Sequence, residues 1–246
     1  MTSVRTKQKM LILHGWDWRK YPKFKPTHQW GNRQELLNRL MKEFHVDYPN
    51  LPGFNFNDSY SGAWSLDDYS SWLEKLIKEN KYDVVVGYSF GCAVIIHCLH
   101  KYKLTIKSIL ISPALVRAYT IKTSSTSSKI SSLLKRFRLI WIRSIAVLFY
   151  LKYVVKNDFY IHGTKFLRKT YQNIVRIDLS GECNELLEKG ADMHFIFGSE
   201  DTATPPDLFL KRVPKANNCV HIIDGATHNV GGTHPVDVAS VIESLV

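Results

Sequence analysis

The stretch DVVVGYSFGCAV, residues 83–94, decides the fold class of this chain. Its valines form a short, continuous apolar run, which is typical of a strand buried on both faces of a sheet. The run meets Gly87, and Ser89 stands between this glycine and Gly91. A helical pattern follows. The stretch therefore predicts a strand, a tight turn that holds a serine, and a helix.

The two glycines beside Ser89 have a steric reason. A turn this tight lifts the serine side chain above the sheet edge and strains its backbone. Side chains at positions 87 and 91 would clash with each other and with the neighbouring strand, so we expect glycine at both. The helix that begins near Gly91 points its free amides and the positive end of its dipole at whatever Ser89 attacks. The pattern is typical of a nucleophile elbow.

Apolar segments rich in β-branched residues recur along the chain, bounded by turn residues and separated by helical patterns. Besides 83–89, they are 10–15, 44–49, 108–114, 193–198 and 219–224. This alternation predicts an α/β fold with a doubly wound, mostly parallel sheet of about six strands. Ser65, with Asp68 three residues later, predicts a helix that begins there and ends near residue 80.

A serine hydroxyl is a weak nucleophile, so it needs a base, and the base needs an acid that orients it. The chain offers these residues in the order Ser89, Asp201, His228. Asp201 follows the fifth expected strand, and His228 follows the sixth. The carboxyl ends of the strands meet at one rim of an open α/β sheet, where a ligand crevice is expected.

Other residues compete for two of these roles. Glu200 is the nearest alternative acid. An alternative role for Asp201 is to cap the helix that follows Pro205 and Pro206. His234 is the nearest alternative base, but it precedes a proline and is expected to begin the last helix. We prefer Asp201 and His228 and leave the alternatives open.

The first expected strand runs into the letters HGW at residues 14–16. With the strand order 2-1-3-4-5-6, this loop lies beside Ser89. The backbone N–H groups of Trp16 and Phe90 are then candidates to hold a developing oxyanion. His14 is expected to shape the loop, and it joins Tyr88 as a candidate for contact with the substrate.

Residues 115–177 interrupt the strand–helix rhythm. They hold 13 of the 33 Lys and Arg residues and one of the 22 acidic residues, a net charge of +12 that leaves −1 for the rest. On a helical wheel one side carries Ile130, Leu133, Leu134, Phe137 and Trp141, and another carries Lys129, Arg136 and Arg143. We therefore expect a core of residues 1–114 and 178–246 and a basic helical lid between them, with Trp141 as a candidate for substrate contact.

Several classes of protein are not expected. No run of about 18 uncharged apolar residues predicts a membrane span, and the first residues lack the features of a signal peptide. The four cysteines have no CxxC spacing, which favours reduced thiols in a cytoplasmic protein. HCLH at 97–100 is a poor zinc site without distant partners, so neither a metal nor another cofactor is expected. Nothing resembles a nucleic-acid recognition module, so no nucleic-acid partner is expected.

The chain resembles the α/β-hydrolase fold superfamily, in its lid-bearing branch of small intracellular serine hydrolases. The motifs, in order, are LILHGW (11–16), LPGF (51–54), VVGYSFG (85–91), FGSEDTATP (197–205) and GATHNVGGTHP (225–235). The resemblance covers nearly the whole chain and implies a Ser-His-Asp mechanism, with Asp201 as the acid. In departure from the family, the usual first two strands are missing, Cys92 stands where glycine is usual, and the lid is the least recognisable part.

The resulting expectation is an esterase-like serine hydrolase. Ser89, deprotonated by His228, would attack the carbonyl carbon of an ester, thioester or amide, and water would release the acyl group. A small-molecule carboxylic ester with an apolar acyl part is preferred, because the lid supplies aromatic side chains. Two alternatives stay open: an acyltransferase with the same residues, and a protein that binds an anionic membrane or partner through the basic lid. The oligomeric state is not predicted.

Overall fold

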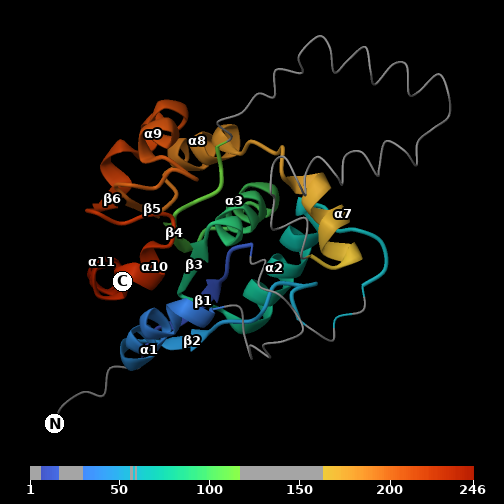
Figure 1. Cartoon of the computed structure of the whole chain (residues 1–246), viewed down its shortest axis with the longest axis horizontal. Coiled ribbons are helices and arrows are strands. Elements are labelled where there is room, and N and C mark those ends of the chain that lie inside the picture. The colour runs from blue at the N-terminus through green and yellow to red at the C-terminus, as the bar shows by residue number, and fades with distance from the viewer. Residues whose placement is uncertain (1–6, 17–29, 56–57, 59, 117–162) are drawn as a thin grey trace.

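The computed structural model describes residues 7–16, 30–55, 58, 60–116 and 163–246 (Figure 1). In this part of the chain six strands form one sheet in the order β2-β1-β3-β4-β5-β6, and every neighbouring pair is parallel. The strands are β1 (Lys9–Leu13), β2 (His45–Asp47), β3 (Val84–Tyr88), β4 (Lys107–Ile111), β5 (Met193–Gly198) and β6 (Val220–Ile223). The predicted fold class and strand order are confirmed.

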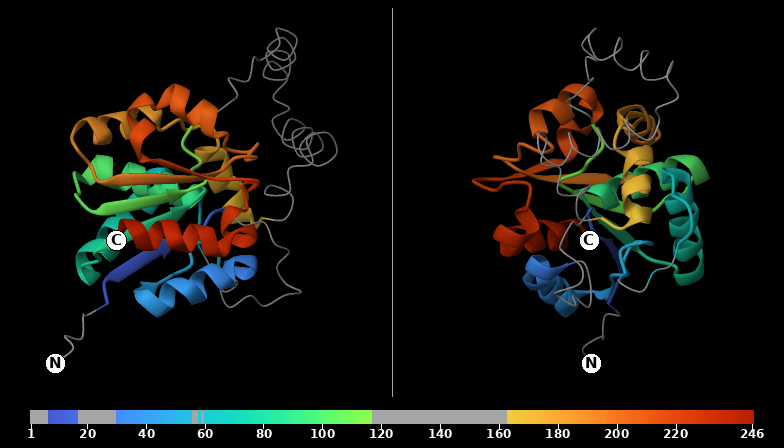
Figure 2. Two further views of the ribbon diagram at one scale, coloured as in Figure 1. Left: turned by 90° about the vertical axis from the view of Figure 1, so that its left-hand side faces the viewer. Right: turned by 45° about the vertical axis from the view of Figure 1, so that its right-hand side comes forward.

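Helices cover both faces of the sheet (Figure 2). One face packs against α1 (Gln34–Glu43), α10 (Val230–Thr233) and α11 (Pro235–Leu245), and the short η1 (Gly31–Arg33) contacts α1 and α10. The other packs against α2 (Leu66–Asn80), α3 (Phe90–Tyr102), α7 (Lys165–Ile174), α8 (Ser180–Glu188), α9 (Pro206–Arg212) and η3 (Pro214–Cys219). The sheet is therefore a central layer with a hydrophobic core on each side.

Strand β3 explains why its sequence reads as a continuous apolar run. Val84, Val86 and Tyr88 face the core that contains α1 and α11, whereas Val85 faces the core that contains α2 and α3. Every residue of the strand is buried. A parallel strand covered by helices on both faces has no exposed face for polar side chains, so its side chains are apolar on both faces.

Helix α2 begins where its capping pattern predicts. The Ser65 hydroxyl accepts a hydrogen bond from the Asp68 backbone N–H at 3.3 Å, and the Asp68 carboxylate accepts one from the Ser65 backbone N–H at 2.7 Å. Two amides that lack an intrahelical acceptor are satisfied in this way, and the acidic side chain also lies at the positive end of the helix dipole.

Most of the predicted basic lid, residues 117–162, lies outside the described residues, and with it the helical stripes and Trp141. The last helix of the predicted insert, α7, is described and lies next to α2 (Figure 1). Phe166, Leu167 and Ile174 of α7 are buried in the same core as α2 and α3. The domain division at residues 114 and 178 stays a prediction. None of the helices in the described residues is long and apolar enough to cross a bilayer.

Candidate active site

Ser89 occupies the tight turn between β3 and α3 in a conformation that side chains rarely adopt. Its φ is 49° and its ψ is −107°. Three backbone hydrogen bonds hold it: its N–H donates to the Ile111 carbonyl at 2.9 Å, and its carbonyl accepts from Cys92 and Ala114 at 3.2 Å each. The strain is thus balanced by contacts with β4 and with the first turn of α3.

The two glycines beside Ser89 are required, but not quite for the expected reason. A Cβ at Gly87 would lie 2.8 Å from the backbone nitrogen of Cys92, inside α3. A Cβ at Gly91 would lie 2.5 Å from the carbonyl oxygen of Leu13, at the end of β1. The clash with a neighbouring strand is confirmed for Gly91, whereas Gly87 is restricted by the helix and not by Gly91. Helix α3 can lie this close to the sheet only because both positions lack a side chain.

Ser89, His228 and Asp201 lie in one hydrogen-bonded chain. His228 Nε2 is 3.1 Å from Ser89 Oγ, and His228 Nδ1 is 2.9 Å from Asp201 Oδ2. A carboxylate only accepts hydrogen bonds, so Nδ1 carries the proton and Nε2 presents its lone pair to the Ser89 hydroxyl. The Asp201 side chain is fully buried, and the His228 side chain is one-third exposed. The arrangement can remove a proton from Ser89.

The competing residues are not part of this chain of hydrogen bonds. Glu200 is exposed, and its backbone N–H donates to the Ala226 carbonyl. His234 is the N-cap of α11, as the proline after it predicted. The cap of α9 is a proline without a side-chain hydrogen bond, so Asp201 does not cap that helix. Among these candidates the structure brings together Asp201 and His228.

The Asp201 carboxylate is held on both oxygens. Oδ1 accepts from the backbone N–H groups of Ala203 at 2.9 Å and Thr204 at 2.8 Å. Oδ2 accepts from His228 and from the Thr204 hydroxyl at 2.7 Å. Burial alone would raise the pKa of Asp201, but the hydrogen bonds from His228 and Thr204 outweigh it and hold the pKa below its ordinary value. The sequence reasoning missed Thr204; the signal was a hydroxyl residue within the turn that follows the acid.

The loops that carry Asp201 and His228 touch through their backbones. A Cβ at Gly198, the last residue of β5, would lie 2.1 Å from the Ala226 carbonyl oxygen. Next to it, the Ser199 backbone N–H donates to the Ile223 carbonyl at 2.9 Å. This glycine therefore lets the loop after β6 come close enough for the His228 ring to reach Asp201.

Tyr88, a predicted substrate contact, is buried below the site. Its hydroxyl donates to the backbone carbonyl of His228, and the Arg33 guanidinium lies 4.0 Å above its ring centre. Burial raises the pKa of Tyr88, which keeps the hydroxyl protonated and able to donate. These contacts hold the His228 loop against β3. Contact between Tyr88 and a substrate stays a prediction.

The loop after β1 lies directly against Ser89, as the strand order predicts. A Cβ at Gly15 would be 3.0 Å from Ser89 Cβ. Phe90 is the first residue of α3, so its N–H has no acceptor within the helix. Trp16 follows Gly15, and its ring contacts the Phe90 ring at a centroid distance of 5.2 Å. The residues expected to provide the two amides are therefore neighbours beside the serine, and their role as an oxyanion hole is taken up below.

His14 is buried, and backbone groups engage both of its ring nitrogens. The Leu51 N–H donates to Nε2 at 2.8 Å, so Nδ1 carries the proton and donates to the Gly15 carbonyl at 2.6 Å. The ring thus ties the loop after β1 to the segment after β2. The contacts agree with the loop-shaping place expected for His14, and contact with a substrate stays a prediction.

Aromatic side chains surround the loop beside Ser89. The Trp16 ring lies edge-on to Phe54, Phe90 and Tyr171, with centroid distances of 5.0, 5.2 and 5.5 Å. Tyr171 belongs to α7, the helix at the end of the predicted insert. The aromatic contact predicted from the sequence, Trp141, lies earlier in the insert. Helix α7, at the C-terminal end of the insert, brings the Tyr171 ring to this edge of the sheet.

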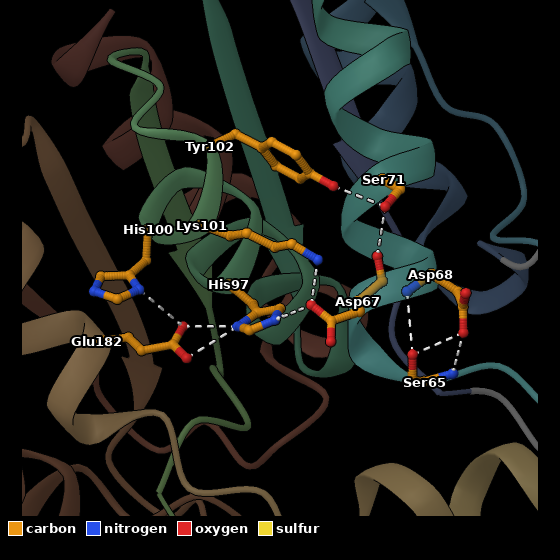
Figure 3. Close-up of polar contacts among 9 residues, drawn as sticks. All are labelled: Ser65, Asp67, Asp68, Ser71, His97, His100, Lys101, Tyr102 and Glu182. Atoms are coloured by element: carbon orange, nitrogen blue, oxygen red, sulfur yellow. Dashed lines mark hydrogen bonds and ion pairs between the residues drawn. The ribbon is translucent and has the colours of Figure 1, made fainter.

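A second polar cluster lies away from Ser89, where α2, α3 and α8 meet (Figure 3). His97 Nδ1 is 2.9 Å from the Glu182 carboxylate, and its Nε2 is 3.1 Å from Asp67. Both partners only accept, so both contacts are hydrogen bonds when both ring nitrogens carry protons, and His97 is then a cation between two helices. Lys101 also contacts Asp67, and His100 lies 3.9 Å from Glu182. The HCLH motif therefore forms ion pairs, and within the described residues no group of His, Cys, Asp or Glu is arranged to hold a metal.

Comparison with solved structures found the same fold in hydrolytic enzymes of low sequence identity. A serine hydrolase involved in carbazole degradation matches with a TM-score of 0.66 and 15% identity, over 98% of this chain and 91% of that chain. An esterase from Thermogutta terrifontis matches with a TM-score of 0.62 and 16% identity, over 97% and 89%. A monoacylglycerol lipase from Paleococcus ferrophilus matches with a TM-score of 0.58 and 17% identity, over 98% and 96%.

A search of curated proteins found no match to this chain. The sequence pattern of the alpha/beta hydrolase family, in contrast, matches residues 10–241. That span includes all six strands except Lys9, the first residue of β1, together with the turn at Ser89 and the loops that carry Asp201 and His228. The chain belongs to the alpha/beta hydrolase family.

Proposed function

We propose that this protein is a serine hydrolase that cleaves a carboxylic ester through an acyl-enzyme intermediate. Ser89 is the nucleophile, His228 the general base and Asp201 the acid that orients it. The observation that carries the proposal is the continuous hydrogen-bonded chain from Ser89 Oγ through the His228 ring to Asp201, with distances of 3.1 and 2.9 Å. Each contact joins the atoms that proton transfer needs.

In the first half of the reaction, His228 Nε2 takes the proton of the Ser89 hydroxyl while Oγ forms a bond to the ester carbonyl carbon. The carbonyl oxygen becomes an oxyanion in a tetrahedral intermediate. His228, now an imidazolium, is stabilised by the Asp201 carboxylate. It then gives its Nε2 proton to the alcohol oxygen as the bond between this oxygen and the acyl carbon breaks. The alcohol leaves, and the acyl group stays on Ser89.

The oxyanion needs donors that are fixed before the reaction begins. We assign this role to the backbone N–H groups of Phe90 and Trp16. The Phe90 amide lies at the N-terminus of α3, where the helix dipole adds a partial positive charge. The loop that contains Trp16 is tied down by His14 and packed against Ser89 through Gly15. Such prearranged amides can contribute several kcal/mol to transition-state stabilisation, about 2.7–4 per donor.

In the second half of the reaction, water replaces the alcohol. His228 Nε2 takes a proton from the water molecule while its oxygen attacks the acyl carbon. The proton then passes to Ser89 Oγ as the bond between Oγ and the acyl carbon breaks. A carboxylic acid leaves, and the enzyme returns to its starting state. Apart from the ester and this water molecule, both halves use only groups of this chain.

Two observations favour an ester with an apolar acyl part. The partly exposed rings of Trp16 and Tyr171 meet at the loop beside Ser89, over the buried rings of Phe54 and Phe90, and aromatic surfaces bind apolar groups better than charged ones. The similar structures include a protein described as an esterase and another described as a monoacylglycerol lipase. Oxygen esters are also easier to cleave than amides, so the first assay should use them.

The test is hydrolysis of p-nitrophenyl esters from acetate to decanoate by the wild-type protein and by Ser89→Ala. We expect release of nitrophenol and of the free carboxylic acid, with a preference for chains longer than acetate. Ser89→Ala should lower the rate by several orders of magnitude while its circular dichroism spectrum stays the same. Equal rates for the two proteins would overturn the assignment of Ser89. A matched thioester and anilide series shows whether the oxygen ester is the preferred substrate class.

A further inference from the structure

We propose that Thr204 is a positioning residue for the reaction: its hydroxyl fixes the rotation of the Asp201 carboxylate and offsets part of the charge that this carboxylate presents to His228. The inference rests on the proposed function. It assigns a role to a side chain that touches neither the reacting bond nor Ser89.

The hydroxyl of Thr204 and the ring of His228 share one acceptor atom. Asp201 Oδ2 receives the Thr204 hydroxyl at 2.7 Å and the His228 Nδ1–H at 2.9 Å. The Thr204 oxygen also lies 3.3 Å from His228 Nδ1. The three polar groups therefore form a triangle, in which each one limits where the other two can lie.

The other carboxylate oxygen is held by backbone groups alone. Oδ1 accepts from the N–H groups of Ala203 and Thr204, which any side chain at position 204 other than proline would leave in place. Loss of the hydroxyl would thus keep the carboxylate in the turn but leave Oδ2 with His228 as its remaining partner. The Asp201 side chain is fully buried, so a lost hydrogen bond is not easily replaced by water.

The hydroxyl also affects how strongly the carboxylate stabilises a protonated His228. A donor on Oδ2 withdraws negative charge from the atom that faces the imidazolium. Without it, the carboxylate presents its full charge to the imidazolium that His228 becomes during the reaction. Of the other groups near His228, Ser89 and Tyr88 are neutral. The charged Arg33 lies over the ring of Tyr88. A change at position 204 leaves all three in place.

The experiment compares Thr204→Val, which keeps the shape and removes the hydroxyl, with Thr204→Ser, which keeps the hydroxyl. Thr202→Val is the matched control, because Thr202 is an exposed residue of the same turn. The readouts are kcat and KM for p-nitrophenyl acetate, and the pH dependence of the rate at which a fluorophosphonate labels the protein. Thermal unfolding is measured alongside.

We expect Thr204→Val to lower kcat by roughly 5- to 30-fold, the range for one hydrogen bond to a charged group that is only partly used in the transition state. KM should stay within about twofold, because Thr204 does not touch the substrate. The acidic limb of the labelling profile should move to higher pH. Thr204→Ser and Thr202→Val should stay close to the wild type in all three measurements.

The inference is overturned if Thr204→Val lowers only the unfolding temperature, with kcat and the acidic limb unchanged, or if Thr204→Ser is as damaging as Thr204→Val. Should Thr204→Val not fold, Thr204→Ala also lacks the hydroxyl and replaces it in the comparison. Ser89→Ala in the same assay separates this failure from that of the proposed function. If Ser89→Ala keeps its activity, the proposed function fails and the role of Thr204 fails with it.

Discussion

The hydroxyl of Tyr88 donates a hydrogen bond to the backbone carbonyl of His228, while the hydroxyl of Ser89, the next residue, meets the His228 ring. Two consecutive residues at the end of β3 thus hold the main chain and the side chain of the same histidine. The position of His228 relative to Ser89 is therefore fixed in two ways: by the hydrogen bond from Tyr88 to the His228 backbone, and by the contact between the Ser89 hydroxyl and the ring.

Tyr88→Phe should therefore reduce activity as well as stability. The variant loses one hydrogen bond, about 0.5–1.5 kcal/mol of unfolding free energy, and lets the His228 backbone move away from β3. We expect kcat for p-nitrophenyl acetate to fall by roughly 3- to 10-fold, since small misplacements of a base are costly. Tyr69→Phe is the matched control, because the buried Tyr69 hydroxyl donates to the Pro52 carbonyl at 3.0 Å. It should lose stability and keep kcat; equal losses of kcat in both variants would contradict the role given to Tyr88.

A second prediction concerns the close contact between α3 and β1. Gly91→Ala places a methyl group 2.5 Å from the Leu13 carbonyl oxygen, so either the helix or the strand must move. We expect the unfolding free energy to fall by about 1–3 kcal/mol, as at other overpacked sites, and the activity to fall as well. Gly181→Ala in α8 is the control, because a Cβ there meets nothing within 4 Å. Urea unfolding should show it as stable as the wild type or slightly more so; a harmless Gly91→Ala would show that the contact is not restrictive.

A third prediction separates the two neighbouring acids. Asp201→Asn keeps the size of the side chain but offers an N–H group where His228 needs an acceptor, which favours the wrong tautomer of the ring. The expected loss in kcat is on the order of 10⁴. Glu200→Gln changes an exposed side chain and should stay within about twofold of the wild type. The reverse result in steady-state kinetics would mean that Glu200 is the orienting acid.

A fourth prediction concerns pH and the His97 ion pairs of Figure 3. The hydrogen bond with Glu182, aided by Asp67 and opposed by partial burial, raises the pKa of His97 above its usual value. A raised pKa in the folded state gives stability that is fully present below the pKa of the unfolded chain, about 6.5, and is lost as pH rises through the folded value. Wild type should thus exceed His97→Gln in unfolding free energy at pH 6 by roughly 0.5–1 kcal/mol, the range for a partly exposed pair.

The difference between the wild type and His97→Gln should shrink as the pH is raised from 6 to 9 in urea unfolding experiments. His45→Gln, a change at an exposed position of β2, is the control for replacing a histidine outside these ion pairs. A constant or growing difference for His97→Gln would mean that His97 is not the cation that joins α2 to α8.

Much of the fold follows from local sequence signals. The valine run of β3 and the Ser65–Asp68 cap each span only a few residues. The structure contains the strand and the helix start that these two patterns predict. The order of the strands follows from general rules of α/β topology, and with it the closeness of Gly15 to Ser89. The order Ser89, Asp201, His228 was also readable, because each residue follows a strand end.

Other features of the site depend on geometry that residue patterns do not carry. The donation from Thr204 to Asp201 depends on the exact path of one turn, and that from Tyr88 to His228 depends on how the loop after β6 lies over β3. The need for glycine at position 87 was predicted correctly, but a side chain there would clash with Cys92 in the following helix. For residues 117–162, helical periodicity gives the faces of the expected helices but not their place above the sheet.

The central claim, that Ser89 is a nucleophile activated by His228, is tested most directly by labelling with a fluorophosphonate and locating the adduct by mass spectrometry. Ser89 Oγ should bond to phosphorus and release fluoride, which places the added mass on the tryptic peptide of residues 82–101, where Ser89 is the sole serine. We predict one adduct per chain on that serine, absent from Ser89→Ala and at least about 10²-fold slower in His228→Ala. No adduct on Ser89 in the folded protein, or equally fast labelling of it in His228→Ala, would contradict the claim.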